Sequence, residues 1–181
     1  IIGGGVIGCA IARELAKWKL SIVLLEKEED VAVHASSRND GMVHEGFAAK
    51  PGTLKARLNV EGNKLWEPLA ADLGIEFSRP GSILLFNSAT TEALYPAFAA
   101  RAALNKVDSW DYWSPAKIRE EEPYAAYGRS GGFFLPATGI ISPYKATVAL
   151  AESAIMNGVR IELLTCVTGF ELDGNRITRV I

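Results

Sequence analysis

Residues 1–26 read IIGGGVIGCAIARELAKWKLSIVLLE, a glycine turn between apolar segments. Gly3, Gly5 and Gly8 satisfy the pattern G-x-G-x-x-G. In this pattern the first glycine permits a tight turn, the second lets the backbone approach a pyrophosphate, and the third lets a helix pack against a strand. A helix is predicted over residues 6–18, with Ile7, Ile11 and Leu15 on one stripe, and the apolar run over 20–25 suits a buried parallel strand. The segment therefore predicts a right-handed βαβ unit that binds a dinucleotide.

Glu26 ends the second predicted strand, 18 residues after Gly8. This spacing is close to the roughly 20 residues expected for the carboxylate that binds ribose hydroxyls. The pyrophosphate would meet the N-terminal N–H groups of the helix. The charge of Glu26 would repel a 2′-phosphate, which argues against NADP. The motif leaves FAD and NAD open, and a structural turn followed by a surface Glu is the alternative.

The composition is that of a soluble globular chain of one large or two small domains. Of the 181 residues, 49% are hydrophobic and 22% charged, and the net charge is −2, which argues against a nucleic-acid partner. No apolar run approaches the roughly 20 residues of a membrane span, and no secretory signal is visible. Cys9 and Cys166 show no metal spacing, so we expect no metal site, two core cysteines and a cytoplasmic location.

The rest of the chain alternates helices and strands. An amphipathic helix is predicted over 54–73, with its apolar stripe at Leu54, Leu58, Leu65 and Leu69. Further helices are predicted over 91–107 and after two Ser-Pro helix starts at 114–115 and 142–143. Strands are predicted at 76–77, 82–86, 110–113, 132–135, 139–141, 159–164 and 167–172, and a turn at 173–175 leads into a final hairpin strand. Gly41–Lys50 is expected to begin as a short helix. We expect a discontinuous domain of residues 1–73 and 140–181, with residues 74–139 inserted and both ends of the chain truncated.

A second constellation follows the βαβ unit. Residues 36–46 read SSRNDGMVHEG and gather small, polar and glycine residues in one loop. Such a loop can turn its amides toward a polar ligand, although a solvated loop is the alternative.

The glycine turn, this loop and Gly52-Thr53-Leu54-Lys55-Ala56 together resemble the D-amino-acid-oxidase-type flavoenzymes. Ala137-Thr138-Gly139-Ile140-Ile141-Ser142-Pro143-Tyr144 and Val167-Thr168-Gly169 are also similar to that group. Within it, the chain looks most like the FAD-dependent glycerol-3-phosphate dehydrogenases, and next like the L-2-hydroxyglutarate oxidases. The resemblance implies an α/β fold: a Rossmann-like FAD-binding domain interleaved with a mixed α+β substrate domain.

The resemblance also implies which residues hold FAD. Glu26 would bind the adenosine ribose, and Val167 would meet the adenine end through its backbone. The full set of expected cofactor-binding residues is Gly3, Gly5, Val6, Ile7, Gly8, Glu26, Lys27, Ser36, Ser37, Arg38, Asn39, Gly41, Met42 and Val167. Some relatives attach the flavin to a histidine of this loop. Arg38 takes that place here, so we predict non-covalent FAD.

His44 is the candidate catalytic residue. The family pattern places it near the flavin ring, and an imidazole titrates near neutral pH, so it could take the hydroxyl proton of an alcohol. A histidine that bonds the loop backbone, or one that tunes the flavin, is the alternative. Lys50 and Arg38 could each meet an anionic substrate, or be surface or cofactor-side charges.

The resemblance implies oxidation of a small anionic 2-hydroxy substrate, first of all sn-glycerol 3-phosphate to dihydroxyacetone phosphate. The electrons would then pass to a quinone, an acceptor protein or oxygen, and peripheral association with the inner face of the membrane would fit such an acceptor. The alternatives are an L-2-hydroxyglutarate oxidase, an amino-acid oxidase, a non-catalytic FAD-binding module and an NAD-binding domain. We expect the 181-residue chain to be inactive alone.

Overall fold

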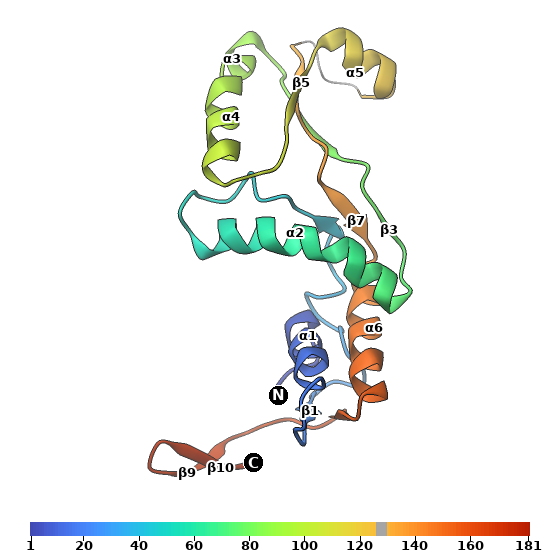
Figure 1. Ribbon diagram of the computed structural model, residues 1–181, viewed down its shortest axis with the longest axis vertical. Helices are drawn as coiled ribbons and strands as arrows, with labels where there is room; N and C mark the ends of the chain where they lie inside the picture. The colour runs from blue at the N-terminus through green and yellow to red at the C-terminus, as the bar shows by residue number, and fades with distance from the viewer. Residues whose placement is uncertain (126–129) are drawn as a thin grey trace. The chain divides into compact units, whose positions relative to one another are not determined.

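A computed structural model of the chain describes residues 1–125 and 130–181. It divides into two compact units, both traced in Figure 1. Unit 1 comprises Ile1–Gly41, Asp72–Ile75 and Ser142–Ile181, and unit 2 comprises Met42–Ala71 and Glu76–Ile141. In the part of the chain that the structure describes, no helix is both long and apolar enough to cross a membrane.

Unit 1 contains the predicted βαβ unit. The helices and strands of unit 1 are α1 (Val6–Leu15), β1 (Val23–Leu25), α6 (Pro143–Met156), β8 (Arg160–Glu162), β9 (Phe170–Asp173) and β10 (Arg176–Val180). Strand β1 pairs in parallel with β8, and Ile2 forms a parallel bridge with Leu25 on the other side. Strands β9 and β10 form the predicted antiparallel hairpin. The parallel bridge between Ile2 and Leu25, with α1 between them in the chain, confirms the order strand, helix, strand predicted for residues 1–26.

Small side chains let the two helices of unit 1 pack closely. Helix α1 lies along α6 (Figure 1), and the buried positions include Cys9 and Ala12 on α1 and Ala146 and Ala154 on α6. The larger apolar residues of α1 that the helical periodicity aligns are exposed instead, Ile7 at 73% and Ile11 at 46%. The periodicity therefore located the helix, while the buried face is the neighbouring one with the small residues.

Unit 2 holds two three-stranded sheets and most of the remaining helices. The first sheet has the order β2 (Met42–Val43), β7 (Gly139–Ile141), β3 (Phe77–Ser78), and the second β4 (Ser82–Leu85), β6 (Gly132–Leu135), β5 (Asp111–Trp113). All these pairings are antiparallel. The helices are α2 (Leu54–Leu73, whose last two residues belong to unit 1), α3 (Ala89–Glu92), α4 (Tyr95–Leu104) and α5 (Pro115–Glu121).

An aromatic core holds unit 2 together. Phe47, from the loop after β2, packs on Phe133 of β6 with ring centroids 4.8 Å apart, and edge-on against Phe98 of α4 at 5.6 Å. Such tilted and edge-to-face pairs are favoured over face-to-face stacking. Since β2 also pairs with β7, residues 42–71 pack with residues 76–141. The expected boundary at residues 73 and 74 therefore differs from the division between the compact units.

Most of the predicted helix ends are confirmed. Ser114 and Ser142 cap α5 and α6 by accepting from the N–H groups of Lys117 and Lys145. Gly74 ends α2 with a φ of +66°, a conformation that costs glycine little. The predicted helix over 91–107 is divided between α3 and α4, and Pro96 stands in the first turn of α4.

Three expectations were wrong. Residues 42–43 form a strand, not the start of a helix, because they extend the sheet beside β7. Cys166 is exposed and lies outside any strand, whereas Cys9 is buried as predicted. Leu54, Leu58 and Leu65, the apolar stripe of α2, are at least half exposed, and α2 buries Ala56, Asn63 and Ala70 instead.

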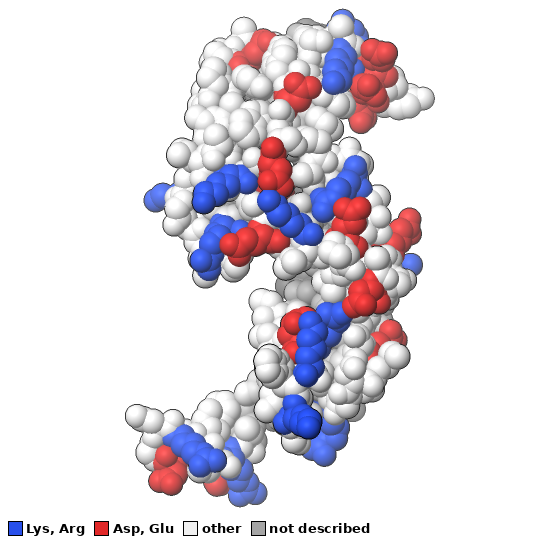
Figure 2. Space-filling view, viewed as in Figure 1, with Lys and Arg blue, Asp and Glu red and all other residues white. Residues whose placement is uncertain are grey.

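Charged side chains of both signs are mixed on the surface. On the face shown in Figure 2, Lys and Arg alternate with Asp and Glu over each unit, so no large field of one sign forms there. This pattern agrees with the net charge of −2.

Candidate functional site

The glycine turn brings the start of α1 close to the end of the preceding segment. Gly3 has a φ of +97°, which favours glycine, and its N–H donates to the Leu25 carbonyl at 2.8 Å. A methyl carbon built on Gly8 would lie 1.9 Å from the Gly3 carbonyl oxygen, so only glycine fits. One built on Gly5 would lie 3.0 Å from Ser36 Oγ. Gly3 therefore serves the tight turn, and Gly5 and Gly8 serve close approaches, as the motif requires.

Glu26 stands at the end of β1 with its carboxylate turned back to the glycine turn. It is 9% exposed, and its two oxygens accept from the Gly4 N–H at 2.5 Å and the Glu28 N–H at 2.9 Å. A carboxylate offers about four acceptor positions, so two remain after these bonds. The carboxylate is thus fixed beside the turn and retains the capacity to accept hydrogen bonds from two ribose hydroxyls.

The loop over residues 31–39 covers the same turn. The Ala32 N–H donates to the Gly4 carbonyl at 3.0 Å, and the Val6 N–H donates to Ser36 Oγ at 2.9 Å. The N-cap residue of α1 is Gly5, which has no side chain to accept from the first N–H groups of the helix. Ser36 therefore accepts from one of them in its place. A helix that begins at a glycine turn is the kind of backbone arrangement that binds anions.

The remaining predicted residues of unit 1 lie around this turn with different exposure. Asn39 folds its own loop, since its Nδ2 donates to the Ala35 carbonyl and its Oδ1 accepts from the Gly41 N–H, both at 3.0 Å. Val167 follows a segment that the Thr165 N–H ties to the Glu26 carbonyl at 2.8 Å, so it lies at the Glu26 end of β1. Lys27, Ile7 and Arg38 are exposed, and Ser37 donates to the His34 carbonyl.

These features fit the pyrophosphate and ribose of a dinucleotide such as FAD. Gly3 turns the chain, Gly8 lets α1 begin against that turn, and Glu26 has free acceptor positions for the ribose. Unit 1 thus brings together the glycines, Glu26, Ser36 and the segment before Val167.

Met42 and His44 belong to unit 2. Strand β2 ends at Val43, and the exposed side chain of His44 follows between the buried residues Val43 and Glu45. This alternation is that of an extended segment with one face toward the core. Gly46 then turns the chain with a φ of +100°, and a methyl carbon on it would lie 2.6 Å from Val60 Cγ2.

Buried polar side chains hold this segment, and sequence reasoning missed all of them. Asn63 Nδ2 donates to the carbonyls of Val43 at 3.1 Å and Ala137 at 3.0 Å. Asn105 Nδ2 donates to the carbonyls of Gly46 and Ala49, both at 2.8 Å.

The carboxylate of Glu45 accepts from the Thr138 hydroxyl, and Thr138 Oγ1 lies 2.8 Å from Ser82 Oγ. The sequence offered one indication. In an extended segment, Glu45 lies two residues after Val43 and therefore on the same buried face, where a charged side chain needs a partner.

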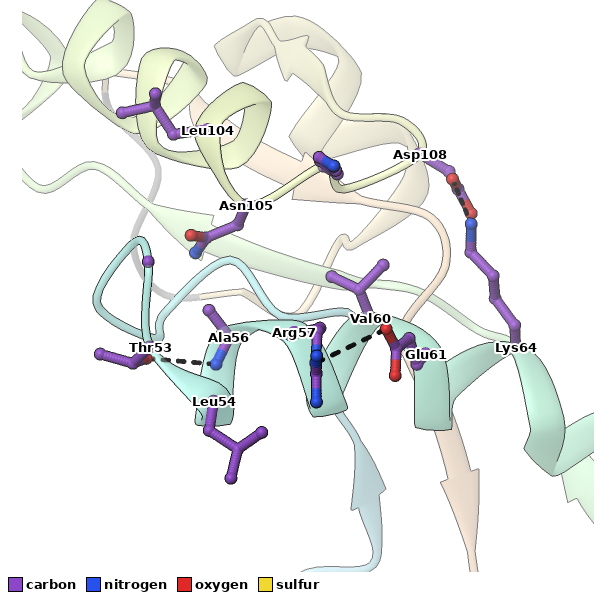
Figure 3. A pocket seen from close by; sticks show the side chains of 12 residues that line it. Thr53, Leu54, Ala56, Arg57, Val60, Glu61, Lys64, Leu104, Asn105 and Asp108 are labelled. Atoms are coloured by element: carbon purple, nitrogen blue, oxygen red, sulfur yellow. Dashed lines mark hydrogen bonds and ion pairs between the residues drawn. The ribbon is translucent and has the colours of Figure 1, made fainter.

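A hollow of about 650 Å³ lies elsewhere in unit 2, between the first half of α2 and the turn after α4 (Figure 3). Lys64 and Asp108 form an ion pair of 2.8 Å at its side, and Arg57 and Glu61 form a looser one of 3.8 Å. Among the described residues that line it, none is a predicted cofactor-binding residue or His44. The hollow therefore contains none of the predicted site residues, and it shares only Asn105 with the side chains that hold the His44 segment.

Comparisons with known proteins agree with this geometry. The family model of FAD dependent oxidoreductases (DAO) matches residues 1–181. The chain is 40% identical to a glycerol 3-phosphate dehydrogenase of Caloramator mitchellensis. The alignment covers 94% of the chain and 36% of that protein. It is 33% identical to an L-2-hydroxyglutarate dehydrogenase of Escherichia coli strain UMN026, over 84% of the chain and 36% of that protein.

Among solved structures, the chain is similar to an L-alpha-glycerophosphate oxidase from Mycoplasma pneumoniae with FAD bound. The TM-score is 0.87 at 29% identity, and the match covers 93% of the chain and 45% of that protein. The chain thus spans between a third and a half of the length of these relatives. With a family match over its whole length, the chain belongs to the DAO family of FAD dependent oxidoreductases.

Proposed function

We propose that the protein of which this chain forms part oxidises a small anionic 2-hydroxy compound, and that its substrate is sn-glycerol 3-phosphate. The observation that carries the proposal is the 40% identity to a glycerol 3-phosphate dehydrogenase over 94% of the chain. The fold of a glycerophosphate oxidase with FAD bound supports the same substrate class. The product would be dihydroxyacetone phosphate.

Residues of unit 1 would hold the cofactor. Gly3, Gly5 and Gly8 admit the pyrophosphate to the start of α1, and Glu26 accepts from the ribose hydroxyls. FAD, when bound, supplies the two-electron acceptor that takes the hydride from C2 of the substrate. We also propose that FAD is not covalently attached, because the exposed Arg38 stands where a flavin-linked histidine would be aligned. Denaturation with acid should then release all the flavin into the supernatant.

His44 is the proposed base of this reaction. Its imidazole accepts the proton of the C2 hydroxyl while the C2–H bond breaks, so that the carbon and oxygen are left as a ketone. The exposure of His44 on a segment held by buried partners supports this role, since a base must be both accessible and fixed. The electrons leave in a second half-reaction to a quinone, an acceptor protein or oxygen.

The test is an anaerobic absorbance scan of the purified whole protein before and after addition of glycerol 3-phosphate. We expect a flavin spectrum that is bleached within the mixing time of a manual experiment. A flavin spectrum that glycerol 3-phosphate leaves unchanged would refute this substrate.

L-2-hydroxyglutarate is the second candidate substrate, because a dehydrogenase of this compound is 33% identical over 84% of the chain. The same scan with L-2-hydroxyglutarate separates the two. Bleaching by that compound alone would assign the protein to the second activity, and bleaching only by an amino acid would exclude both.

A further inference from the structure

Several buried polar side chains of unit 2 hydrogen-bond to the segment that carries His44. Buried polar side chains need hydrogen-bond partners, and their arrangement restricts the backbone that they contact. In the described part of the chain, the buried polar or charged residues are Glu26, Glu45, Asn63, Asn105, Thr138 and Thr147. Glu45 is part of the segment over residues 43–49. Asn63, Asn105 and Thr138 each hydrogen-bond to a residue of this segment.

Two amides fix the carbonyls on either side of His44. Asn63 donates to the Val43 carbonyl, and its own Oδ1 accepts from Arg79 NH1 at 2.9 Å. Asn105 donates to the Gly46 carbonyl. The backbone is therefore tied one residue before and two residues after the imidazole, by side chains that are each 6% exposed.

A chain of hydroxyl groups fixes the residue next to His44. Because a carboxylate only accepts, the Thr138 hydroxyl donates to Glu45, and Thr138 Oγ1 then accepts from the Ser82 hydroxyl. Thr138 is 1% exposed and Glu45 is 6% exposed, so water cannot replace a lost partner without opening the structure. The three side chains link the His44 segment to the start of β4 and to the turn before β7.

We propose that Thr138 is a positioning residue, which holds the His44 segment in its working conformation through Glu45. This proposal rests on the proposed role of His44 as the base. An imidazole on an extended segment moves with its backbone, and a misplacement of about 1 Å can reduce a rate about 100-fold. The bond from Thr138 to Glu45 removes that freedom at the position adjoining His44.

The test compares Thr138→Val with Thr138→Ser in the whole FAD-loaded protein. Valine keeps the shape but removes the donor, so the buried carboxylate loses its partner, whereas serine keeps the hydroxyl. We expect kcat of Thr138→Val to fall about 10-fold or more with KM changed less than about 3-fold, and Thr138→Ser to stay within about 3-fold of the parent protein. Thr91→Val is the matched control, because the Thr91 hydroxyl belongs to the cap of α3 and should not affect kcat.

Amide hydrogen exchange supplies a readout that does not depend on activity. Exchange of the peptide that contains residues 43–46 should become about 10-fold faster in Thr138→Val and stay unchanged in Thr138→Ser and Thr91→Val. If Thr138→Val fails to retain FAD, Glu45→Met takes its place, because it removes the acceptor of the same bond without leaving a buried carboxylate unpaired. An FAD-loaded Glu45→Met protein with unchanged kcat and unchanged exchange would then overturn the proposal.

His44→Ala separates this proposal from the proposed function. If His44→Ala is slow while Thr138→Val keeps both its rate and its exchange, the positioning role fails and the base remains. If His44→Ala turns over at the parent rate, the base is wrong, and Thr138 has no catalytic group to position.

Discussion

The glycine turn of unit 1 and the His44 segment of unit 2 are shaped by different kinds of constraint. The turn is shaped by what is absent: a Cβ on Gly8 would strike the Gly3 carbonyl oxygen, and one on Gly5 would crowd Ser36. The His44 segment is shaped by what is present, namely the buried amides of Asn63 and Asn105 and the hydroxyl of Thr138. The difference implies that unit 1 should fail through steric overlap, and the His44 segment through unpaired polar groups.

Gly8→Ala should have the largest effect on the unit 1 side of this comparison. The new methyl carbon would lie 1.9 Å from a backbone oxygen, which cannot move aside as a flexible side chain could. We expect the whole protein to be purified with almost no flavin, measured by absorbance against protein concentration. Gly62→Ala is the control, since a methyl group in the middle of α2 meets nothing within 4 Å and should stabilise the protein by about 0.5–1 kcal/mol. A Gly8→Ala protein with full flavin content would contradict the steric interpretation.

Asn105→Leu tests the opposite kind of constraint in unit 2. Leucine has a similar size but leaves the carbonyls of Gly46 and Ala49 without their donor in a buried site. We expect the free energy of unfolding to fall by about 2–4 kcal/mol, measured by urea denaturation. The matched change is Asn59→Leu, because Asn59 is only half-buried on α2 and bonds only the Lys55 carbonyl among the described residues, and it should cost less than about 0.5 kcal/mol. Equal losses for the two variants would show that burial of the amide does not matter.

Glu26→Gln tests whether the carboxylate of unit 1 is needed for the ribose. The amide keeps one acceptor but directs an NH₂ group toward the N–H of Gly4 or of Glu28. We expect the dissociation constant for FAD to rise about 10-fold or more, determined by fluorescence titration of the flavin-free protein. Glu29→Gln, at an exposed position nearby, should leave it unchanged. An unaltered affinity in Glu26→Gln would remove the carboxylate from the cofactor site.

The two cysteines should differ in reactivity, which is the mildest of the contrasts. Burial, and secondarily the charge of Glu26, raise the pKa of the Cys9 thiol to about 11. Cys9 therefore stays protonated at pH 8, whereas the exposed Cys166 is accessible. A maleimide at pH 8 should modify Cys166 and leave Cys9 unmodified in the folded protein, as mass spectrometry of the two peptides would show. Modification of Cys9 at a similar rate would mean that the start of α1 opens readily.

The raised pKa of Cys9 also gives a pH dependence. Because the folded state disfavours the thiolate, the stability contribution of this group is complete below the unfolded pKa and is lost as pH rises through about 11. Thermal unfolding at pH 9–11 should show a decline that a Cys9→Ser variant shows to a smaller extent.

The same comparison explains what the sequence could predict. The glycine turn, the helix start at Ser142-Pro143 and the end of α2 at Gly74 depend on residues within a few positions of one another, and all are confirmed. The partners of the His44 segment come from 20 to 93 residues away, and Thr138 and Asn105 carry no local pattern that marks them as its partners. The division between the two compact units differs from the expected boundary for the same reason, because it depends on the pairing of β2 with β7 and on the packing of Phe47.

The stripes of α1 and α2 show a second limit. Helical periodicity located both helices, but burial follows the neighbouring faces with Ala12 and Ala56, and leaves Ile11 and Leu58 exposed. A period of 3.6 residues indicates a helix, whereas the face that is buried depends on which neighbour packs closely enough.

One measurement tests most directly whether unit 1 binds FAD while His44 acts as the base in substrate oxidation. The whole His44→Ala protein would be purified, its flavin spectrum recorded, and the bleaching rate with glycerol 3-phosphate followed anaerobically by stopped flow. We predict a full flavin content and bleaching that is about 100-fold slower or more. Bleaching at the parent rate, or loss of the flavin itself, would contradict the division of roles between the two regions.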